Sequence, residues 1–336
     1  MSKQVEGETF QRVGEWQMAH LEFWGLATLP EVRPGDDLAL LIWEACGREG
    51  LTLREDDVVV VTSKVVSKAE GRVFPLEGIR PGWRARAVAR ATGRDPKLLQ
   101  VILDQSRSIL GEIPLGLAHR YLGALPLGEP ERVSRVLAED RGLLLTVLPS
   151  GLVCTDAGVD GSNVPGAYAA LPPDPDASAA RLRAGLERLA GCRLGVVIAD
   201  TEMKLLRMGS EDIAVGASGV QPMKKEFGAP DRLGRPKFGG VDAVADMLCS
   251  GAALLMGQTS AGVAAVVVRG LQRSGEEAGA SSLAIPASWL GLGLAFLLYS
   301  RVKIRLYLMA YGLADLFGRP LRWLRRGRAG PDRLRM

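Results

Sequence analysis

Hydrophobic and polar residues follow one another along this chain in blocks that predict short strands and amphipathic helices. Residues 38–46, LALLIWEAC, have helical spacing, and the preceding residues 35–37, GDD, place acidic groups at the positive end of the helix dipole. Residues 57–62, DVVVVT, form a β-branched run typical of a buried strand. Further apolar runs predict strands at residues 143–148, 194–200, 213–216 and 264–269.

Apolar residues at helical spacing predict further helices between these strands. One is expected within residues 82–110, with Pro96 as a helix start, and one between the rigid turn at residues 172–177, PPDPDA, and Leu189. Residues 63–72 are expected to turn out of the first buried strand. Because strands and helices alternate irregularly, without a repeated βαβ unit, the sequence predicts an α+β fold.

The next predicted helix covers residues 241–256 and ends at Gly257, which suits the left-handed position that closes many helices. Asp242 and Asp246 are four residues apart and would share one face of this helix, most simply a solvated one. The loop at residues 257–262, GQTSAG, then leads into a strand and offers backbone amides and hydroxyl groups.

Composition and charge exclude several classes of protein. With 47% hydrophobic and 24% charged residues, the 336-residue chain can bury a folded core. The four cysteines are scattered without a C-x-x-C pair, so neither a disulfide framework nor a zinc site is expected. Neither His20 nor His119 lies in a triad motif, and no G-x-x-x-x-G-K-[ST] phosphate loop occurs. Residues 301–336 hold ten basic and two acidic residues, so the mildly acidic remainder carries no nucleic-acid footprint.

The two ends of the chain differ from its body. Residues 1–20 contain acidic residues and no apolar run, so they are interpreted as an N-terminal extension and the protein is expected in the cytoplasm. Residues 272–282, QRSGEEAGASS, have the composition of a linker. Residues 283–336 then form a predicted hydrophobic and basic helical tail.

The tail leaves several arrangements open. Residues 283–300 hold no charge but barely reach the length of a membrane span, and basic residues follow them. An interfacial helix, a short hairpin and burial against the body or a partner subunit all remain possible. Aromatic and arginine side chains suit a headgroup boundary, so attachment to the inner face of the membrane through residues 283–328 is the favoured hypothesis.

Two segments that follow or end predicted strands carry a carboxylate beside small polar residues. They are residues 156–163, DAGVDGSN, and residues 196–201, VVIADT. Mg²⁺ and Mn²⁺ prefer such oxygen ligands and leave positions for water and phosphate oxygens. Asp160 and Asp200 are equally typical of turn and helix caps, and spacing alone favours that structural role.

A hydroxyl and two ammonium groups lie just after the first buried strand, on Ser63, Lys64 and Lys68. They are placed to meet phosphates, although a solvated turn explains them equally well.

Taken together, these segments resemble the coenzyme F420-0:gamma-glutamyl ligase family over about residues 21–271. The motifs that carry the resemblance are LP at 29–30, GDD at 35–37, SKAEGR at 67–72, DAGVDGSN at 156–163, DT at 200–201, AVGASG at 214–219, DRLGR at 231–235, VAD at 244–246 and VVVRGL at 266–271. The resemblance implies an α+β fold and a homodimer. It also implies that GTP and Mn²⁺ or Mg²⁺ activate a carboxylate of F420-0, as an acyl phosphate that the amino group of L-glutamate attacks.

The resemblance also implies roles for individual residues. It implies metal ligands at Asp160, Asp200, Thr201 and Gln258. It implies a GTP site lined by Leu29, Pro30, Glu31, Val32, Ser63, Lys64, Lys68, Asn163, Met256, Gly257, Gln258, Thr259, Ser260, Ala261, Gly262 and Val263. It implies catalytic roles for Lys68, Lys204 and Arg207.

One stretch departs from the family pattern. After the Asp-Thr pair the family has Gly-Arg and then a second Arg, whereas this chain has Met203, Lys204 and Arg207. Lysine keeps the charge but lacks the planar fork that grips a carboxylate or phosphate. Glu202 adds a negative charge beside the predicted metal, as a further ligand or as a group that repels an anionic substrate.

These observations lead to three hypotheses. The first is a GTP- and metal-dependent ligase that joins L-glutamate to F420-0. The alternative is a membrane-associated relative that keeps the nucleotide and metal site but acts on or senses a different carboxylate. The third is a body with a purely structural role.

Overall fold

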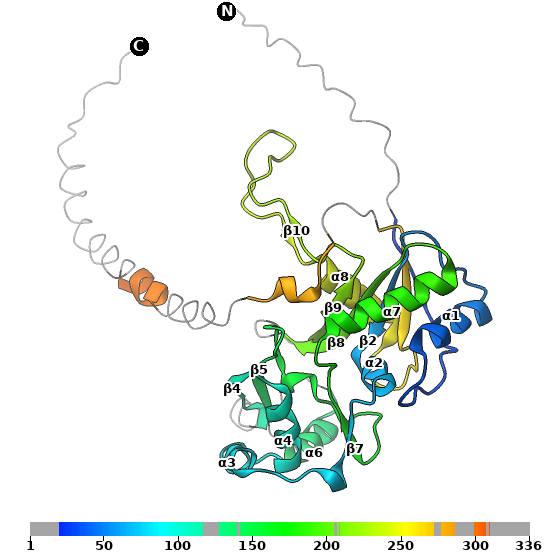
Figure 1. Cartoon of the computed structure of the whole chain (residues 1–336). Helices are drawn as coiled ribbons and strands as arrows, with labels where there is room; N and C mark the ends of the chain where they lie inside the picture. The colour runs from blue at the N-terminus through cyan, green and yellow to red at the C-terminus, as the bar shows by residue number, and fades with distance from the viewer. Residues whose placement is uncertain are drawn as a thin grey trace, which may run out of the picture. The chain divides into compact units, whose positions relative to one another are not determined.

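The computed structural model describes residues 20–116, 128–139, 142–204, 207, 209–271, 277–285, 299–306 and 309. The chain divides into two compact units, Met1–Ala284 and Ile285–Met336. The first unit mixes helices with antiparallel and mixed sheets (Figure 1), which confirms the predicted α+β fold.

A five-stranded sheet forms the centre of the first unit. Its strand order is β1 (Glu22–Gly25), β12 (Ala265–Arg269), β2 (Val58–Thr62), β8 (Gly195–Met203) and β9 (Ser210–Ser218). Strands β2 and β8 run parallel, and the other neighbours are antiparallel. The strands predicted from apolar runs in this sheet are therefore confirmed.

Helices cover both faces of this sheet. Alternate valines of β2 pack on one side against α1 (Leu38–Arg48) and α7 (Pro175–Ala190), and on the other side against α8 (Val244–Met256). A strand buried on both faces needs apolar residues at every position, which explains the unbroken valine run.

A smaller lobe lies within the same unit, below the central sheet in Figure 1. Its elements are β4 (Ser108–Ile113), β5 (Leu143–Val147), β6 (Val153–Thr155), α3 (Trp83–Thr92), α4 (Pro96–Gln105) and α6 (Pro130–Glu139). A short ribbon of β3 (Val73–Pro75) and β7 (Ala167–Ala169), flanked by the 3-10 helices Leu76–Gly78 and Asp156–Gly158, joins the lobe to the sheet. The predicted helical region 82–110 is thus two helices and the start of a strand, because Gly93 ends α3 in the left-handed conformation.

Two further predictions of local structure are wrong. Residues 63–69 form helix α2 (Ser63–Ala69) rather than a turn, and Ser67 and Lys68 are buried in it, so its polar residues hid the helical pattern. Helix α8 begins at Val244, whereas Asp242 lies in β11 (Val241–Asp242), paired with β10 (Lys224–Lys225). Asp242 and Asp246 therefore do not share a helix face.

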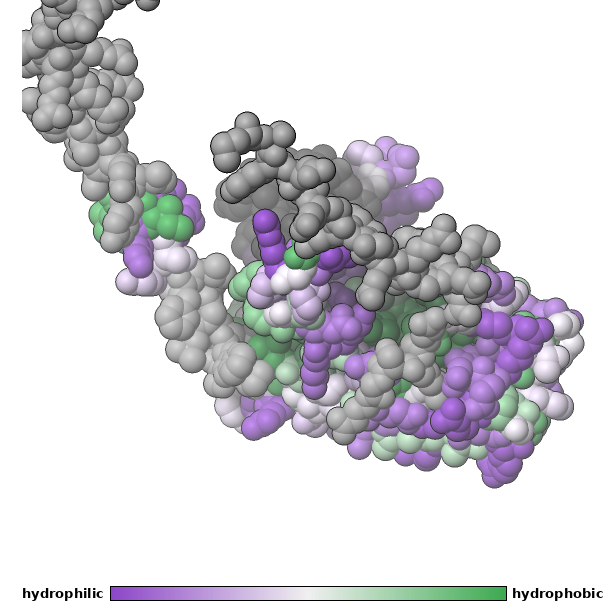
Figure 2. All heavy atoms as spheres, turned by 90° about the horizontal axis from the view of Figure 1, so that it is seen from above, coloured by the Kyte–Doolittle hydropathy of each residue, from purple (hydrophilic) through white to green (hydrophobic). Residues whose placement is uncertain are grey.

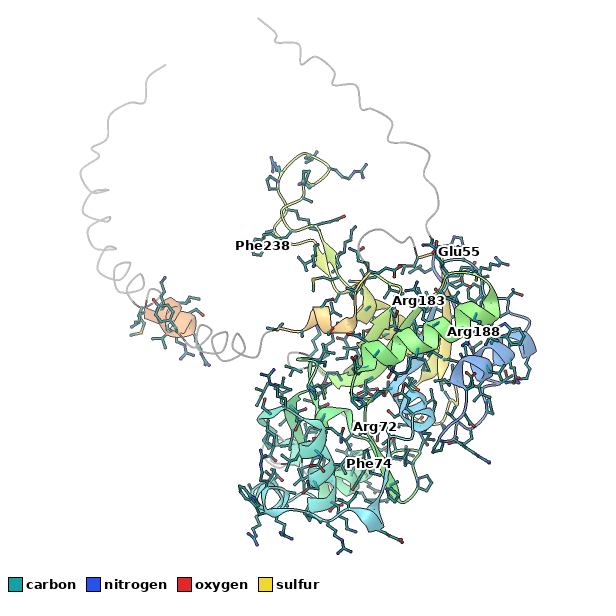
Figure 3. The ribbon with its side chains drawn as sticks, viewed as in Figure 1. Glu55, Arg72, Phe74, Arg183, Arg188 and Phe238 are labelled. Atoms are coloured by element: carbon teal, nitrogen blue, oxygen red, sulfur yellow. The ribbon has the colours of Figure 1, made fainter. Side chains whose placement is uncertain are left out.

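A long hairpin, residues 224–242, leaves the sheet ahead of α8 and is here called the arm. Figure 1 shows it extending beyond the body from β10, and Figure 3 shows Phe238 on it, away from the body. The Asp231 carboxylate accepts the backbone N–H groups of Leu233 and Arg235 and so fixes the tip. Phe238 is 94% exposed and meets Phe227 edge to face at 5.2 Å between ring centroids.

The described end of the predicted linker, residues 277–282, packs against the first unit. Asp176 at the start of α7 accepts the N–H of Ala217 on β9 and the N–H groups of Ala280 and Ser281. Ala280 is fully buried in the 3-10 helix Ala280–Leu283. A Cβ on Gly279 would meet the Asp176 carboxylate at 2.2 Å, so this close approach requires glycine.

In the second unit the structure describes a helical segment at residues 299–306. Hydrophobic and hydrophilic side chains lie next to each other on it, in the coloured stretch within the grey chain of Figure 2. Most of the predicted hydrophobic stretch, residues 286–298, lies outside the described residues. Among the helices that are described, none has the length and apolar character needed to cross a bilayer.

Candidate functional site

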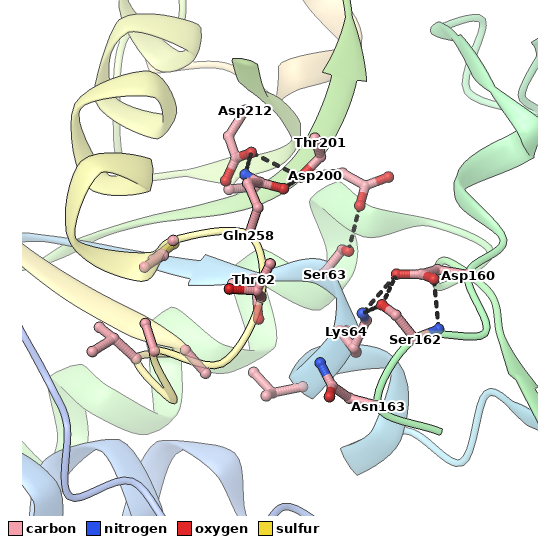
Figure 4. Close-up of a pocket in the computed structure, with 18 of the residues that line it drawn as sticks. Thr62, Ser63, Lys64, Asp160, Ser162, Asn163, Asp200, Thr201, Asp212 and Gln258 are labelled. Carbon is pink, nitrogen blue, oxygen red and sulfur yellow. Dashed lines mark hydrogen bonds and ion pairs between the residues drawn. The ribbon is translucent and has the colours of Figure 1, made fainter. Parts of the chain in front are cut away.

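A cavity of about 600 Å³ opens at one edge of the central sheet. It lies between the ends of β2 and β8, helix α2, the loop before α1, the loop after α8 and residues 158–163 (Figure 4). Every residue to which the family resemblance assigns GTP or metal binding lines this pocket. The roles themselves remain predictions.

Sheet topology explains why these segments meet. Strands β2 and β8 are parallel, so their carboxyl ends lie at the same edge, where ligands commonly bind in such sheets. Ser63 follows β2 directly, and Asp200 and Thr201 lie on β8 past a bulge between Ile198 and Ala199. Asp200 is therefore inside a strand, not at its exit as the sequence predicted, because β8 continues to Met203.

One wall of the pocket, here called the sheet side, carries Asp200, Thr201, Asp212 and Gln258. Thr201 on β8 lies opposite Asp212 on β9, and their side chains hydrogen-bond at 2.9 Å. The Gln258 amide donates through Nε2 to Asp212 Oδ1 at 3.0 Å, and Gln258 Oε1 lies 3.0 Å from Thr201 Oγ1. Asp200 accepts a hydrogen bond of 2.8 Å from Ser63.

Asp200 carries a strongly perturbed carboxyl group. Loss of surrounding water raises the pKa of Asp200 to about 7 despite the hydrogen bond from Ser63, and the carboxylates of Asp160, Glu202 and Asp212 raise it further. In the described part of the chain, no lysine or arginine forms an ion pair with Asp200. Its ionised form is therefore costly unless a cation is close.

The opposite wall, here called the loop side, carries Glu31, Lys64, Lys68, Asp160 and Ser162. Lys64 lies 2.6 Å from Asp160, and Ser162 donates to the same carboxylate through its N–H and its hydroxyl. Burial by itself raises the pKa of Asp160, but these hydrogen bonds outweigh it and hold the pKa below its ordinary value. Lys68 pairs with Glu31 at 2.5 Å.

A strained turn carries Asp160 into the pocket. Asp156, Ala157 and Gly158 all have positive φ, and a Cβ on Gly158 would meet Leu171 at 2.5 Å. The buried Arg94 binds both oxygens of Asp156 at 2.7 and 2.8 Å and fixes the start of the turn. Such a bidentate pair is well suited to hold a backbone in an unfavourable conformation.

The sheet side has the composition of a site for a hard divalent cation. Within the described residues, no three Asp, Glu, His or Cys side chains gather closely enough to hold a metal ion by themselves. A mixed set of oxygens is present instead: the Asp200 carboxylate, the Thr201 hydroxyl and the Gln258 amide oxygen. Mg²⁺ and Mn²⁺ are commonly held by one or two carboxylates plus neutral oxygens, water and substrate phosphates, so the residues fit such an ion.

The residues of the divergent stretch lie elsewhere. Lys204 pairs with Glu211 on β9, Arg207 is exposed, and neither lines the pocket. Glu202 accepts the backbone N–H groups of Thr155 and Met203 and so ties β6 to β8. Both of its carboxylate oxygens have backbone partners, and its expected role as a metal ligand or as a group that repels a substrate stays a prediction.

Sequence reasoning missed Asp212, Ser162 and the support from Arg94. Asp212 precedes an apolar run and has no motif of its own, but the hairpin register of β8 and β9 places it opposite Thr201. Ser162 lies within the motif at residues 156–163, but the sequence gives it no role of its own. Arg94 has no signal in the sequence, because its partner Asp156 is 62 residues away.

Comparison with known proteins gives consistent results. The sequence model of the F420-0:Gamma-glutamyl ligase family matches residues 27–270. The "Coenzyme F420:L-glutamate ligase" of Methanopyrus kandleri is 38% identical over 243 residues, which cover 72% of this chain and 84% of that protein. Proteins of the same name from Archaeoglobus fulgidus and Haloarcula marismortui are 37% and 34% identical, over 76% and 78% of this chain and 90% and 92% of their own lengths.

Proposed function

The chain belongs to the F420-0:gamma-glutamyl ligase family and is an acid–amino-acid ligase, and from this premise we propose that it joins L-glutamate to F420-0 with GTP and Mn²⁺ or Mg²⁺. The observation that carries the proposal is the pocket, in which an oxygen-rich sheet side faces two lysines across about 600 Å³. Carboxylate and hydroxyl oxygens suit a divalent cation, and ammonium groups suit phosphate oxygens.

In the proposed reaction the terminal phosphate of GTP passes to a carboxylate of F420-0 and gives an acyl phosphate with release of GDP. The amino group of L-glutamate then attacks the acyl carbon, phosphate leaves, and an amide bond forms. A bound divalent cation would offset the charge that develops on the transferred phosphoryl group.

The chain's own residues have distinct tasks in this scheme. Asp200, Thr201 and Gln258 would hold the cation, with Asp160 facing them across the pocket. Lys64 and Lys68 are paired with Asp160 and Glu31, and phosphate oxygens would compete for these ammonium groups. The N–H groups and hydroxyls of residues 257–262 would surround the rest of the nucleotide.

The test is mass spectrometry of F420-0 incubated with the full chain, GTP, L-glutamate and Mn²⁺. We expect a product heavier by one or more glutamyl units, together with GDP and phosphate. The Asp200→Asn variant under the same conditions serves as the inactive control. A wild-type protein that leaves F420-0 unchanged would overturn the proposed acceptor.

A different carboxylate acceptor is the second candidate, and the residues of the divergent stretch favour it. Lys204 is held by Glu211, and Glu202 by backbone amides, so this stretch offers no arginine fork at the pocket. GTP turnover that is stimulated by other carboxylic acids but not by F420-0 would support this candidate.

We also propose that the protein forms a homodimer through the arm and α8. Helix α8 has one charged residue, Asp246, and leaves Met247, Leu254 and Leu255 exposed, with Leu254 at 87%. A helix that is apolar on all sides is normally covered, and the arm adds the exposed Phe227 and Phe238. Two copies can cover each other's patches about a two-fold axis. Sedimentation of a Phe238→Glu variant as a monomer would support this arrangement.

The tail is proposed to attach the protein to the cytoplasmic face of the membrane. In the described segment, Tyr299, Val302 and Leu306 are exposed at spacings that share one helix side, with Arg301 and Arg305 among them. Such a pattern suits an anionic lipid surface. Flotation of the full chain with vesicles containing anionic lipid, but not with neutral vesicles, is the expected result.

A further inference from the structure

Three side chains of the sheet side contact one another through polar atoms. The Asp212 carboxylate meets the Thr201 hydroxyl at 2.9 Å and the Gln258 amide nitrogen at 3.0 Å, both through Oδ1, and Gln258 Oε1 lies 3.0 Å from Thr201 Oγ1. Thr201 and Gln258 are exposed to the pocket, whereas Asp212 behind them is only 4% exposed. Figure 4 shows Asp212 next to Gln258 and Thr201, with dashed lines for its hydrogen bonds.

The group has too few hydrogens for a hydrogen bond at each of its three contacts. The Thr201 hydroxyl has one hydrogen, but its oxygen contacts two acceptor oxygens, Asp212 Oδ1 and Gln258 Oε1. An ionised carboxylate only accepts, so Asp212 takes the hydroxyl hydrogen and also the Gln258 N–H. The Thr201 and Gln258 oxygens then face each other with no hydrogen between them. Two acceptor oxygens at that separation are suited to a shared cation.

The Asp212 carboxylate also fixes the orientation of the Gln258 amide. A flipped amide would place two acceptor oxygens against each other at Asp212, so the carboxylate keeps the amide nitrogen toward itself and the amide oxygen toward Thr201. The position of Asp212 is itself rigid, because β9 pairs with β8 at this residue and Ser250 on α8 donates to the Asp212 carbonyl.

We propose that Asp212 is a positioning residue that orients Thr201 and Gln258 as neutral oxygen ligands of the divalent cation. The proposal rests on the proposed metal dependence and assigns Asp212 no contact with the cation. Residues that orient metal ligands in this way typically contribute about 10- to 100-fold to metal affinity.

The test is a calorimetric titration of the full chain with Mn²⁺, alone and with GDP. In Asp212→Leu the acceptor shared by Thr201 and Gln258 is lost, so neither side chain is held with its oxygen toward the cation and Mn²⁺ affinity falls about 10- to 100-fold. Asp212→Asn should keep most of the affinity, since its amide oxygen can take the place of Oδ1 and accept both hydrogens. A merely structural role of Asp212 would lower the stability of Asp212→Leu and leave the Mn²⁺ affinity of the folded protein unchanged.

Asp246→Asn is the matched control. Asp246 is a half-buried carboxylate on α8, and it accepts the backbone N–H of Ala214 instead of a hydrogen from a side chain of the pocket. Its Mn²⁺ affinity should equal that of the wild type. Unchanged binding in Asp212→Leu, an equal loss of affinity in Asp212→Asn and Asp212→Leu, or failure of both variants to fold would each overturn the proposal. A wild-type protein that binds no Mn²⁺ under either condition would instead overturn the metal dependence of the proposed function.

Discussion

The two walls of the pocket use the same residue type in opposite ways. On the loop side Asp160 is neutralised by Lys64, and its pKa is low. On the sheet side Asp200 accepts from the neutral Ser63 hydroxyl, and its pKa is raised to about 7. Loop-side geometry is held by ion pairs within the protein, whereas sheet-side geometry is held by strand pairing and by hydrogen bonds of hydroxyl and amide groups.

The two walls therefore differ in what holds their charged groups. On the loop side, both pocket lysines already have carboxylate partners within the protein. The sheet side is electrostatically incomplete without a cation.

Arg94→Met should have the largest effect, because it removes the ion pair that supports the loop side. Loss of one partner of a buried pair leaves Asp156 charged without compensation and should lower the free energy of unfolding by about 3–5 kcal/mol. Urea unfolding measures this change. Arg193→Met, which breaks the exposed pair with Glu55, is the control and should leave the free energy of unfolding nearly unchanged. Equal effects of the two variants would contradict the role of Arg94.

Asp200→Asn should abolish most of the ligase activity, because it removes the one carboxylate of the proposed cation set on the sheet side. The expected loss is about 10²- to 10³-fold in kcat/KM, corresponding to several kcal/mol of transition-state stabilisation. At pH 8 the free energy of unfolding of the metal-free protein should be higher in this variant than in the wild type. The raised pKa of Asp200 means that its ionised form destabilises the folded protein, and the Asn side chain carries no charge. Thermal unfolding in EDTA tests this sign, and a lower melting temperature would contradict it.

Mn²⁺ binding should depend on pH through Asp200. With a pKa of about 7, this carboxyl is mostly protonated at pH 6 and mostly ionised at pH 8, so Mn²⁺ affinity should rise about tenfold between them. The metal-free protein should show the opposite trend from this group. Its folded pKa lies above the ordinary value, so the contribution to stability falls as pH rises from about 4 to about 7. Mn²⁺ affinity that does not change between pH 6 and pH 8 would contradict the assignment of Asp200 as a ligand of the cation.

Glu31→Gln should have the smallest effect, although it breaks a loop-side ion pair. Glu31 is largely exposed, so the pair with Lys68 should contribute less than about 1 kcal/mol to the free energy of unfolding. Equilibrium unfolding of this variant beside Lys68→Met separates the loss of a pair from the loss of a buried ammonium group. A cost above about 2 kcal/mol for Glu31→Gln would mean that this pair is structural.

The central sheet could be predicted because its strands are buried on both faces. The run from Val58 to Val61 and the strand at Gly195 show this in unbroken apolar residues. Helix α2 could not be predicted, because Ser63, Ser67 and Lys68 are polar residues that are buried, and Ser63 and Lys68 line the pocket. The pattern of hydrophobic residues identifies an element through its core, and α2 turns part of its inner face to a site.

The candidate site divides in the same way. Asp160 and Asp200 could be found from their carboxylates beside small polar residues, and Gln258 through the family resemblance, and all three line one pocket. Asp212 depends on a strand register that the sequence does not state. Lys204 was assigned a role from its charge and its place after a motif, yet its ion pair with Glu211 lies outside the pocket lining.

The contact of Asp176 with residues 280 and 281 decides where this protein can be divided. A truncation after Leu271 would remove Ala280 and Leu283 from the core around α8 and expose apolar surface to aggregation. A truncation after Ala284 would keep that cover. The practical limit for producing the first unit alone is therefore the end of this contact, thirteen residues beyond the last family motif.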